Sequence, residues 1–170
     1  MISNSSYDCD VLIIGAGPAG TTAATILAEE KGRKVIVLEK EHFPRYHVGE
    51  SLIPHCWDTL DRLGMTERLD AKGYQSKQSV QFVGPDGELS TPFYFSKHTD
   101  HPRARTWQVD RASFDTMMME RAREAGAEVR EGIKVLDFLE EDGVITGVTA
   151  EDESGKKFEF DVEWGADLQS

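Results

Sequence analysis

The sequence is poor in cysteine and in any arrangement of residues that typically binds a metal. Its 170 residues contain two cysteines, Cys9 and Cys56, which are too far apart in the chain to form a CxxC motif. The five histidines follow no HExxH or similar spacing. The sequence therefore predicts no metal site, and two reduced, buried thiols are the simplest interpretation of the cysteines.

Positive charge and long apolar runs are scarce as well. The 19 Lys and Arg residues are outnumbered by 31 Asp and Glu residues, which gives a net charge of -12. Nucleic acids and anionic membranes select clustered basic residues, so neither is expected as a partner. An apolar run such as residues 11–14 is too short to span a bilayer, and residues 1–10 lack the features of a signal peptide. We expect a cytoplasmic protein without a membrane span.

The first forty residues have the pattern of a dinucleotide-binding unit. An apolar run at residues 11–14 leads into the segment GAGPAG, and a second apolar run covers residues 34–38. Short apolar runs next to glycine are typical of strands buried on both faces. The Ala- and Thr-rich residues 18–31 between them predict a helix that ends near Gly32. Strand, glycine turn, helix and strand together predict a Rossmann-like βαβ unit with a parallel sheet.

Each glycine of the GAGPAG segment has a separate expected task. Gly15 permits the tight turn, Gly17 lets the backbone approach a pyrophosphate, and Gly20 allows the helix to pack closely on the strand. The helix N-terminus adds free N–H groups and the positive end of its dipole. Glu39, after the second strand, is expected to accept hydrogen bonds from ribose hydroxyls. A structural glycine turn is the alternative, and the motif alone does not decide between FAD and NAD. The predicted pyrophosphate loop consists of Gly15, Ala16, Gly17, Pro18, Ala19 and Gly20.

The rest of the chain alternates between helical and period-two patterns. Ser51 is a good N-cap, and Pro85-Asp86-Gly87 is a hairpin signal. After Gly126 the apolar residues recur with period two between tight turns, which predicts a β-meander. The expected fold class is therefore α/β, with a parallel sheet and an inserted antiparallel meander. The further predicted elements are helices over residues 51–63 and 111–125, strands over residues 79–83, 89–95, 106–109 and 128–131, and the meander over residues 134–162.

Two segments carry a resemblance to a known family. The chain reads FPRYHVGESLIP over residues 43–54 and WQVDRASFD over residues 107–115. Both resemble segments of the flavin-dependent halogenases and related FAD-dependent monooxygenases, whose glutathione-reductase-type fold also contains a meander. The resemblance covers about residues 8–161 and implies FAD as the cofactor. It implies that Arg45 faces the FAD and that Gln108 and Arg111 hold its phosphates or ribityl chain. Further cofactor contacts are expected from Lys40, Gly49, Glu50, Ser51 and Val135.

Lys77 is the candidate catalytic residue. It precedes Phe82 by five residues, the spacing at which the halogenases carry a lysine before a strand phenylalanine. By that resemblance, Lys77 would handle the hypochlorous acid formed when reduced flavin, oxygen and halide react. It could donate a hydrogen bond to this oxidant or, once deprotonated, form a chloramine. The alternative is an exposed loop lysine without a catalytic role.

The resemblance implies an FAD-dependent oxidoreductase that activates oxygen at reduced flavin to halogenate or hydroxylate a small organic substrate. Halide would be a second substrate in the first case, and a separate flavin reductase would supply electrons. A flavoprotein reductase of the geranylgeranyl type and a truncated, non-catalytic nucleotide-binding remnant remain alternatives. The family's substrate domain and Trp-x-Trp-x-Ile-Pro motif do not occur in the sequence. We therefore expect residues 1–170 to be the FAD-binding part of a longer architecture, with an incomplete sheet.

Overall fold

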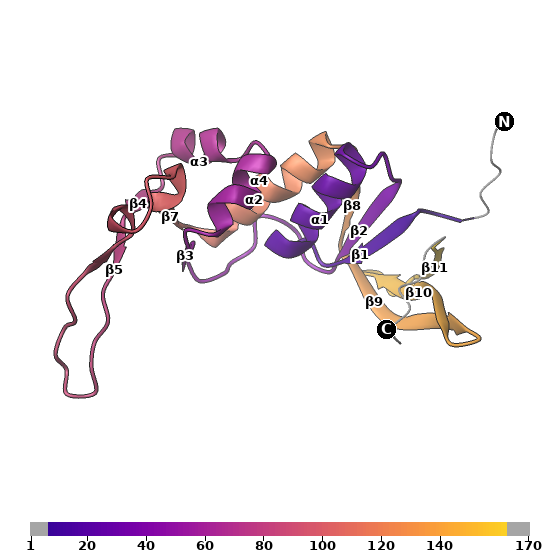
Figure 1. Ribbon diagram of the computed structural model, residues 1–170. Helices are drawn as coiled ribbons and strands as arrows, with labels where there is room; N and C mark the ends of the chain where they lie inside the picture. Colours follow the sequence, from indigo (N-terminus) through magenta and orange to yellow (C-terminus); the bar gives the residue numbers. More distant parts are fainter. Residues whose placement is uncertain (1–6, 163–170) are drawn as a thin grey trace. The chain divides into compact units, whose positions relative to one another are not determined.

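The structure, a computed structural model, describes residues 7–162 in two compact units (Figure 1). The first unit consists of the chain up to residue 45 and from residue 115 onward, and the second unit consists of residues 46–114. The sequence shows no clear pattern over residues 163–170, which lie outside the described part of the chain.

A three-stranded parallel sheet forms the centre of the first unit. Its strands, in spatial order, are β1 (Val11–Ile14), β2 (Val35–Glu39) and β8 (Glu128–Glu131). Val11 pairs with Val35, and Ile36 pairs with Glu128. All five residues of β2 are buried, as expected for a strand with a neighbour on each side and both faces covered. The predicted parallel sheet is confirmed.

Alternate side chains of β2 enter two separate cores. Val35 and Val37 pack with Ala24 of α1 (Pro18–Glu29) and Ala122 of α4 (Arg111–Glu124). Ile36 and its alternate neighbour Leu38 face the opposite core, which the meander strands complete. Because successive strand residues point to opposite faces, the apolar run of β2 serves both cores. The unit thus has three layers, with α1 on one face of the sheet and the meander on the other (Figure 1).

The meander is antiparallel, and its three strands lie in the spatial order β11-β10-β9. The turn that joins β9 to β10 contains Asp142 and Gly143, both with positive φ. Glycine adopts this conformation without steric cost, which is why the Asp-Gly pair marks the turn in the sequence. The predicted meander is confirmed. Its strands are β9 (Ile133–Glu141), β10 (Val144–Asp152) and β11 (Lys157–Asp161).

The second unit is built around a three-stranded antiparallel sheet with a buried tryptophan. Trp107 is 1% exposed, and its indole N–H donates to Asp70 Oδ1 at 2.9 Å. The predicted hairpin around residues 85–87 is present, although its strands are shorter than expected. The sheet strands, in spatial order, are β3 (Glu50–Ser51), β7 (Thr106–Val109) and β4 (Gln75–Lys77). The other elements are α2 (Cys56–Arg62), α3 (Thr66–Lys72), β5 (Ser79–Val80), β6 (Phe93–Tyr94), and the 3-10 helices η1 (Phe95–Lys97) and η2 (Pro102–Ala104).

The predicted helix over residues 51–63 is wrong in its first turn. Ser51 belongs to strand β3, and the backbone N–H of Leu52 donates to the carbonyl of Trp107 at 2.9 Å. Helix α2 begins only after Pro54. Proline disfavours helical geometry at the residue before it, and β7 offers the backbone a pairing partner. Because this partner is distant in sequence, the local pattern at Ser51 predicted a helix where the structure has a strand.

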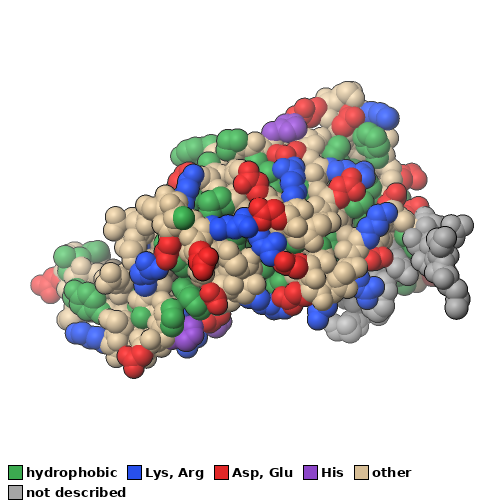
Figure 2. All heavy atoms as spheres, turned by 90° about the horizontal axis from the view of Figure 1, so that it is seen from above, with side chains coloured by type: hydrophobic (Ala, Val, Ile, Leu, Met, Phe, Trp, Pro, Cys, Tyr) green, Lys and Arg blue, Asp and Glu red, His purple; other side chains and the backbone are tan. Residues whose placement is uncertain are grey.

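The described surface mixes charges of both signs. On the face drawn in Figure 2, acidic and basic side chains are interspersed. Within residues 7–162, no helix is both long and apolar enough to cross a membrane. The His, Cys, Asp and Glu side chains of the same residues form no group that could hold a metal ion.

Candidate functional site

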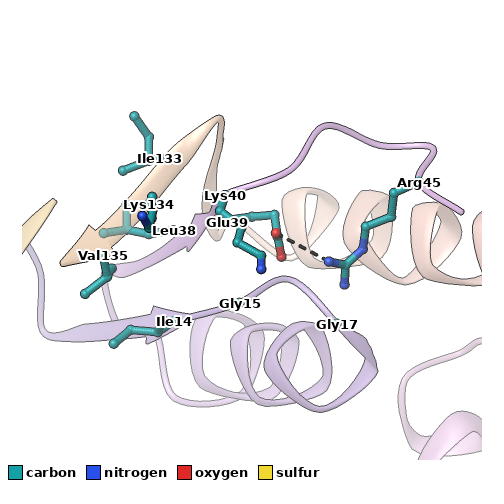
Figure 3. Close-up of a pocket in the computed structure, with 10 residues that line it drawn as sticks. All are labelled: Ile14, Gly15, Gly17, Leu38, Glu39, Lys40, Arg45, Ile133, Lys134 and Val135. Carbon is teal, nitrogen blue, oxygen red and sulfur yellow. Dashed lines mark hydrogen bonds and ion pairs between the residues drawn. The ribbon is translucent and has the colours of Figure 1, made fainter. Parts of the chain in front are cut away.

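A pocket of about 350 Å³ lies in the first unit, where the ends of β1 and β2 meet the start of β9 (Figure 3). Its volume falls within the usual range of small-molecule sites. One part of its wall is apolar and another part carries charged groups. The lining residues are Ile14, Gly15, Gly17, Leu38, Glu39, Lys40, Arg45, Ile133, Lys134 and Val135.

This pocket unites cofactor residues that were predicted from three separate parts of the sequence. The predicted residues in its wall are Gly15, Gly17, Glu39, Lys40, Arg45 and Val135. Four lining residues were not predicted as site residues: Ile14, Leu38, Ile133 and Lys134. Of these, Ile133 and Lys134 directly precede Val135 in β9. Their position follows from the packing of the meander against β2, for which the sequence pattern gives no signal.

Two glycines of the loop are required by the fold itself. A Cβ at Gly20 would lie 2.0 Å from the carbonyl oxygen of Gly15 and 3.2 Å from Ile13 Cγ2. Gly15 has a φ of +97°, which side chains rarely adopt. Gly17 differs, because among residues 7–162 a Cβ there would meet only Arg45 Nη2, at 3.7 Å. The chain's own packing therefore does not explain a glycine at this position.

The remaining loop residues form the start of α1. Gly17 is the N-cap residue, and no side chain caps the helix. Pro18 occupies a first-turn position, where its missing N–H costs no hydrogen bond. Ala16 is fully buried, whereas Ala19 is exposed. The helix thus begins at the pocket with backbone N–H groups that its own side chains do not cap, the arrangement typical of anion sites.

The Glu39 carboxylate ties the glycine loop to the end of β2. Its Oε2 accepts the N–H of Ala16 at 2.8 Å, and its Oε1 accepts the N–H of Glu41 at 3.0 Å. The side chain is nearly buried, with 3% exposed. A ribose contact of Glu39 was predicted from the sequence, whereas its hydrogen bond to the glycine loop was not. An ionised carboxylate has about four acceptor positions, so a ribose hydroxyl can still be accommodated.

The Arg45 guanidinium lies next to Gly17 of the glycine loop. Its Nη1 contacts Glu41 Oε2 at 2.9 Å and Glu39 Oε1 at 3.4 Å. The contact with Glu39 is the dashed line in Figure 3. The guanidinium carbon lies 4.9 Å from the ring centroid of Phe43. Among the described residues, Arg45 Nε is buried and has no hydrogen-bond partner. The group is therefore fixed near Gly17 with a donor still to satisfy.

Glu131 anchors the loop that carries Arg45. Its Oε1 accepts the N–H of Phe43 at 2.6 Å, and its Oε2 accepts a hydrogen bond from Arg123 Nη2 at 2.8 Å. Partial burial by itself raises the pKa of Glu131. The hydrogen bonds from Arg123 and from the Phe43 backbone outweigh burial, so the pKa lies below its ordinary value.

We expect Glu131→Gln to lower the free energy of unfolding by about 1–3 kcal/mol near neutral pH, the range for a hydrogen bond to a charged group. Because the pKa is lower in the folded state, the stabilisation is complete above the unfolded pKa. It is lost as the pH falls through the folded pKa. Urea unfolding of both proteins from neutral to acidic pH measures this, and the two stability curves should converge in acid. Curves that stay parallel would contradict the role of the carboxylate.

The other predicted site residues lie in the second unit, on the sheet β3-β7-β4. Lys77 Nζ donates to Ser51 Oγ at 2.7 Å and lies 3.5 Å from Gln108 Oε1. The Ser51 hydroxyl in turn donates to Gln108 Oε1. Lys77 is half-buried in strand β4 rather than exposed in a loop. The structure therefore brings together three residues that were predicted for different tasks.

Gly49, Glu50 and Arg111 lie beside the same strand. A Cβ at Gly49 would be 3.1 Å from the carbonyl oxygen of Val109, so glycine permits the close approach of this segment to β7. Arg111 Nη1 forms an ion pair with Glu50 Oε2 at 2.8 Å. The predicted site residues thus form two groups, one in each unit.

Comparison with known proteins relates both groups to one domain family. The family model described as FAD binding domain matches residues 8–167. A brominase of 1H-pyrrole-2-carbonyl groups on a peptidyl-carrier protein, from Pseudoalteromonas luteoviolacea, is 39% identical over 138 residues, which cover 81% of this chain and 32% of the brominase. The corresponding chlorinase of Pseudomonas fluorescens is 35% identical over 159 residues, with 83% and 35% covered. The chain thus spans about a third of the length of these relatives.

A solved structure agrees with the sequence relatives. The myxobacterial chondrochloren halogenase, an FAD-dependent enzyme, superposes with a TM-score of 0.84 and 34% sequence identity. The match covers 91% of this chain and 35% of the halogenase. The similarity therefore extends across both units.

Proposed function

The chain belongs to the FAD-binding domain family, and from this premise we propose that its first unit holds the adenine-nucleotide half of FAD for a halogenating oxidoreductase. The observation that carries the proposal is the pair formed by the uncapped start of α1 and the guanidinium of Arg45. Both supply hydrogen-bond donors near Gly17, and the oxygens of a pyrophosphate are strong acceptors for such donors.

The pocket wall supports one orientation of the nucleotide. Gly17 leaves room for the pyrophosphate to approach the backbone, since a Cβ there would contact Arg45 alone among the residues that the structure describes. Glu39 lies beside this point and would accept the ribose hydroxyls. Val135 and Ile133 form an apolar wall of the pocket on which the adenine would pack. Lys40 at the pocket wall adds a positive charge near the phosphates.

FAD supplies, when bound and reduced, the electrons with which oxygen is activated. In the second unit we propose that Lys77 acts on the hypohalous acid that results when halide is oxidised. Its ammonium group donates a hydrogen bond to the oxidant and orients it toward the organic substrate. In the alternative, the neutral amine and hypohalous acid give a haloamine and water. The half-buried position of Lys77 supports this role over that of a surface lysine.

The partners follow from this chemistry. We propose a small organic substrate, a halide ion and a separate flavin reductase as the electron source. Hydroxylation in place of halogenation is the alternative, and Lys77 favours halogenation. A cytoplasmic location is also proposed, on the ground that Cys9 and Cys56 are both free thiols in the structure.

Titration of the purified chain with FAD tests the cofactor proposal, with protein fluorescence and flavin absorbance as readouts. We expect Gly17→Ala to raise the Kd for FAD by about tenfold or more, which corresponds to about 1.4 kcal/mol. The added methyl group fills the space that the pyrophosphate needs, while its 3.7 Å contact with Arg45 is ordinary. The melting temperature should therefore stay close to that of the unmodified chain.

Gly143→Asn is the matched control, because this glycine lies in the β9–β10 turn and asparagine tolerates its positive φ. We expect unchanged FAD binding in this variant. A folded, colourless chain that shows no FAD binding on titration would refute the proposal.

A further inference from the structure

The sheet of the second unit gathers five polar side chains on one face. Ser51 of β3 pairs with Gln108 of β7, and Lys77 of β4 pairs with Thr106 of β7. Residues directly opposite each other in a sheet share a face, and so do residues two apart in one strand. Gln75 of β4 also pairs with Gln108. The side chains that project to the same side are therefore those of Ser51, Gln75, Lys77, Thr106 and Gln108.

The lysine reaches across the central strand to the serine. β3 and β4 flank β7, so their backbones are separated by two strand spacings, about 10 Å. Lys77 Nζ nevertheless lies 2.7 Å from Ser51 Oγ, a distance typical of a strong hydrogen bond to a charged donor. The contact to Gln108 Oε1, at 3.5 Å, is long by comparison. Ser51 is thus the main partner of the ammonium group.

Gln108 sets the orientation of the serine hydroxyl. The Ser51 O–H donates to Gln108 Oε1, which leaves the lone pairs of Ser51 Oγ to accept from Lys77. A serine hydroxyl rotates freely unless one partner fixes its proton. Lys77 therefore donates a hydrogen bond to Ser51, and Ser51 donates one to Gln108.

The neighbouring carboxylate is kept away from the lysine. Glu50 pairs with Val109 in the register, so it projects to the opposite face from Ser51. There its carboxylate forms an ion pair with Arg111 at 2.8 Å. Lys77 consequently meets neutral acceptors, and among residues 7–162 no carboxylate forms an ion pair with it.

We propose that Ser51 is a positioning residue for Lys77, with Gln108 holding the Ser51 hydroxyl in its accepting orientation. This reassigns Ser51 and Gln108, which the sequence resemblance suggested as FAD contacts. The proposal rests on the proposed catalytic role of Lys77 and adds the device that fixes its ammonium group in space. A neutral acceptor holds the group without neutralising it, so the ammonium keeps its ability to donate to an oxidant.

Acylation of individual lysines in the full chain tests the proposal. The protein is treated briefly with acetic anhydride, and the rate at Lys77 is measured by peptide mass spectrometry relative to the exposed Lys157. We expect Ser51→Ala to raise the relative rate at Lys77 by about tenfold, the factor that corresponds to one hydrogen bond to a charged group. Ser51→Thr retains the hydroxyl and should restore the low rate.

Ser96→Ala is the matched control, because it makes the same change at an exposed serine of η1 and should leave the rate at Lys77 unchanged. An unchanged rate in Ser51→Ala, or a high rate in Ser51→Thr, overturns the proposal. If Ser51→Ala does not fold, Gln108→Met removes the acceptor that orients the hydroxyl. A raised rate at Lys77 in that variant supports the proposal, and an unchanged rate overturns it.

The assay requires neither flavin nor halide, so it separates two kinds of failure. If the acylation results are as expected but removal of Lys77 leaves halogenation intact, the catalytic role of Lys77 falls and the Ser51–Lys77 contact stands. If acylation at Lys77 does not respond to Ser51, the positioning proposal falls and the catalytic role is unaffected.

Discussion

Lys77→Ala is expected to reduce halogenation by about 10²–10⁴-fold, the range for loss of a positioned proton donor or acceptor. The measurement uses the chlorinase relative of Pseudomonas fluorescens with this span in place of its own, because the chain covers only part of that enzyme. Reoxidation of the flavin by oxygen should continue in the variant. The reason is that Lys77 is proposed to act on the oxidant after it has formed.

Two further variants sharpen the result. Lys77→Arg keeps the charge and the hydrogen-bond donors but lacks the amine that would form a haloamine. Halogenation that persists in Lys77→Arg would therefore indicate the hydrogen-bonding role, and its loss would indicate the haloamine. Lys97→Ala removes the lysine of η1 next to the Tyr94 ring and should leave halogenation unchanged. Normal halogenation in Lys77→Ala would refute the assignment.

Gly20→Ala is expected to destabilise the chain by about 3 kcal/mol and to abolish FAD binding at micromolar concentrations. Overpacking of a rigid site costs this much, and here the added Cβ would lie 2.0 Å from the carbonyl oxygen of Gly15. In an ordinary helical position a Gly→Ala substitution raises the free energy of unfolding by about 1 kcal/mol. A decrease at Gly20 would therefore indicate the steric conflict with Gly15. Urea unfolding followed by circular dichroism gives the free energy of unfolding.

The comparison with Gly17→Ala makes this test specific. Both substitutions add one methyl group to the same loop, but only the one at Gly20 meets backbone atoms. We expect Gly17→Ala to lose FAD affinity with normal stability, and Gly20→Ala to lose both. Equal stability of the two variants would contradict the close packing of α1 on β1.

The glycine loop is the part of the site that local sequence defines. Gly15 and Gly20 are needed because of atoms within a few residues of them, and the buried strands on either side are marked by continuous apolar runs. The meander was also predictable, since its period-two pattern and its Asp-Gly turn are local features. That the meander forms a wall of the pocket could not be predicted, because this depends on how its strands pack against β2.

Ser51 and Glu39 show where local patterns are insufficient. Ser51 has the chemistry of an N-cap, and the sequence placed it at the start of a helix. In the structure β7 supplies a backbone partner from a position 57 residues away, and the segment becomes a strand. Glu39 was expected to serve only a ligand, yet its carboxylate also accepts the N–H of Ala16.

The sequence by itself thus determined the dinucleotide loop, the buried strands beside it and the family resemblance, because each depends on residues close together in the chain. Tertiary structure alone decided that Arg45 and Val135 share one pocket and that Lys77 meets Ser51. The physical reason is that strand register depends on contacts between distant segments. A one-residue change in that register would turn the same side chains to the opposite face.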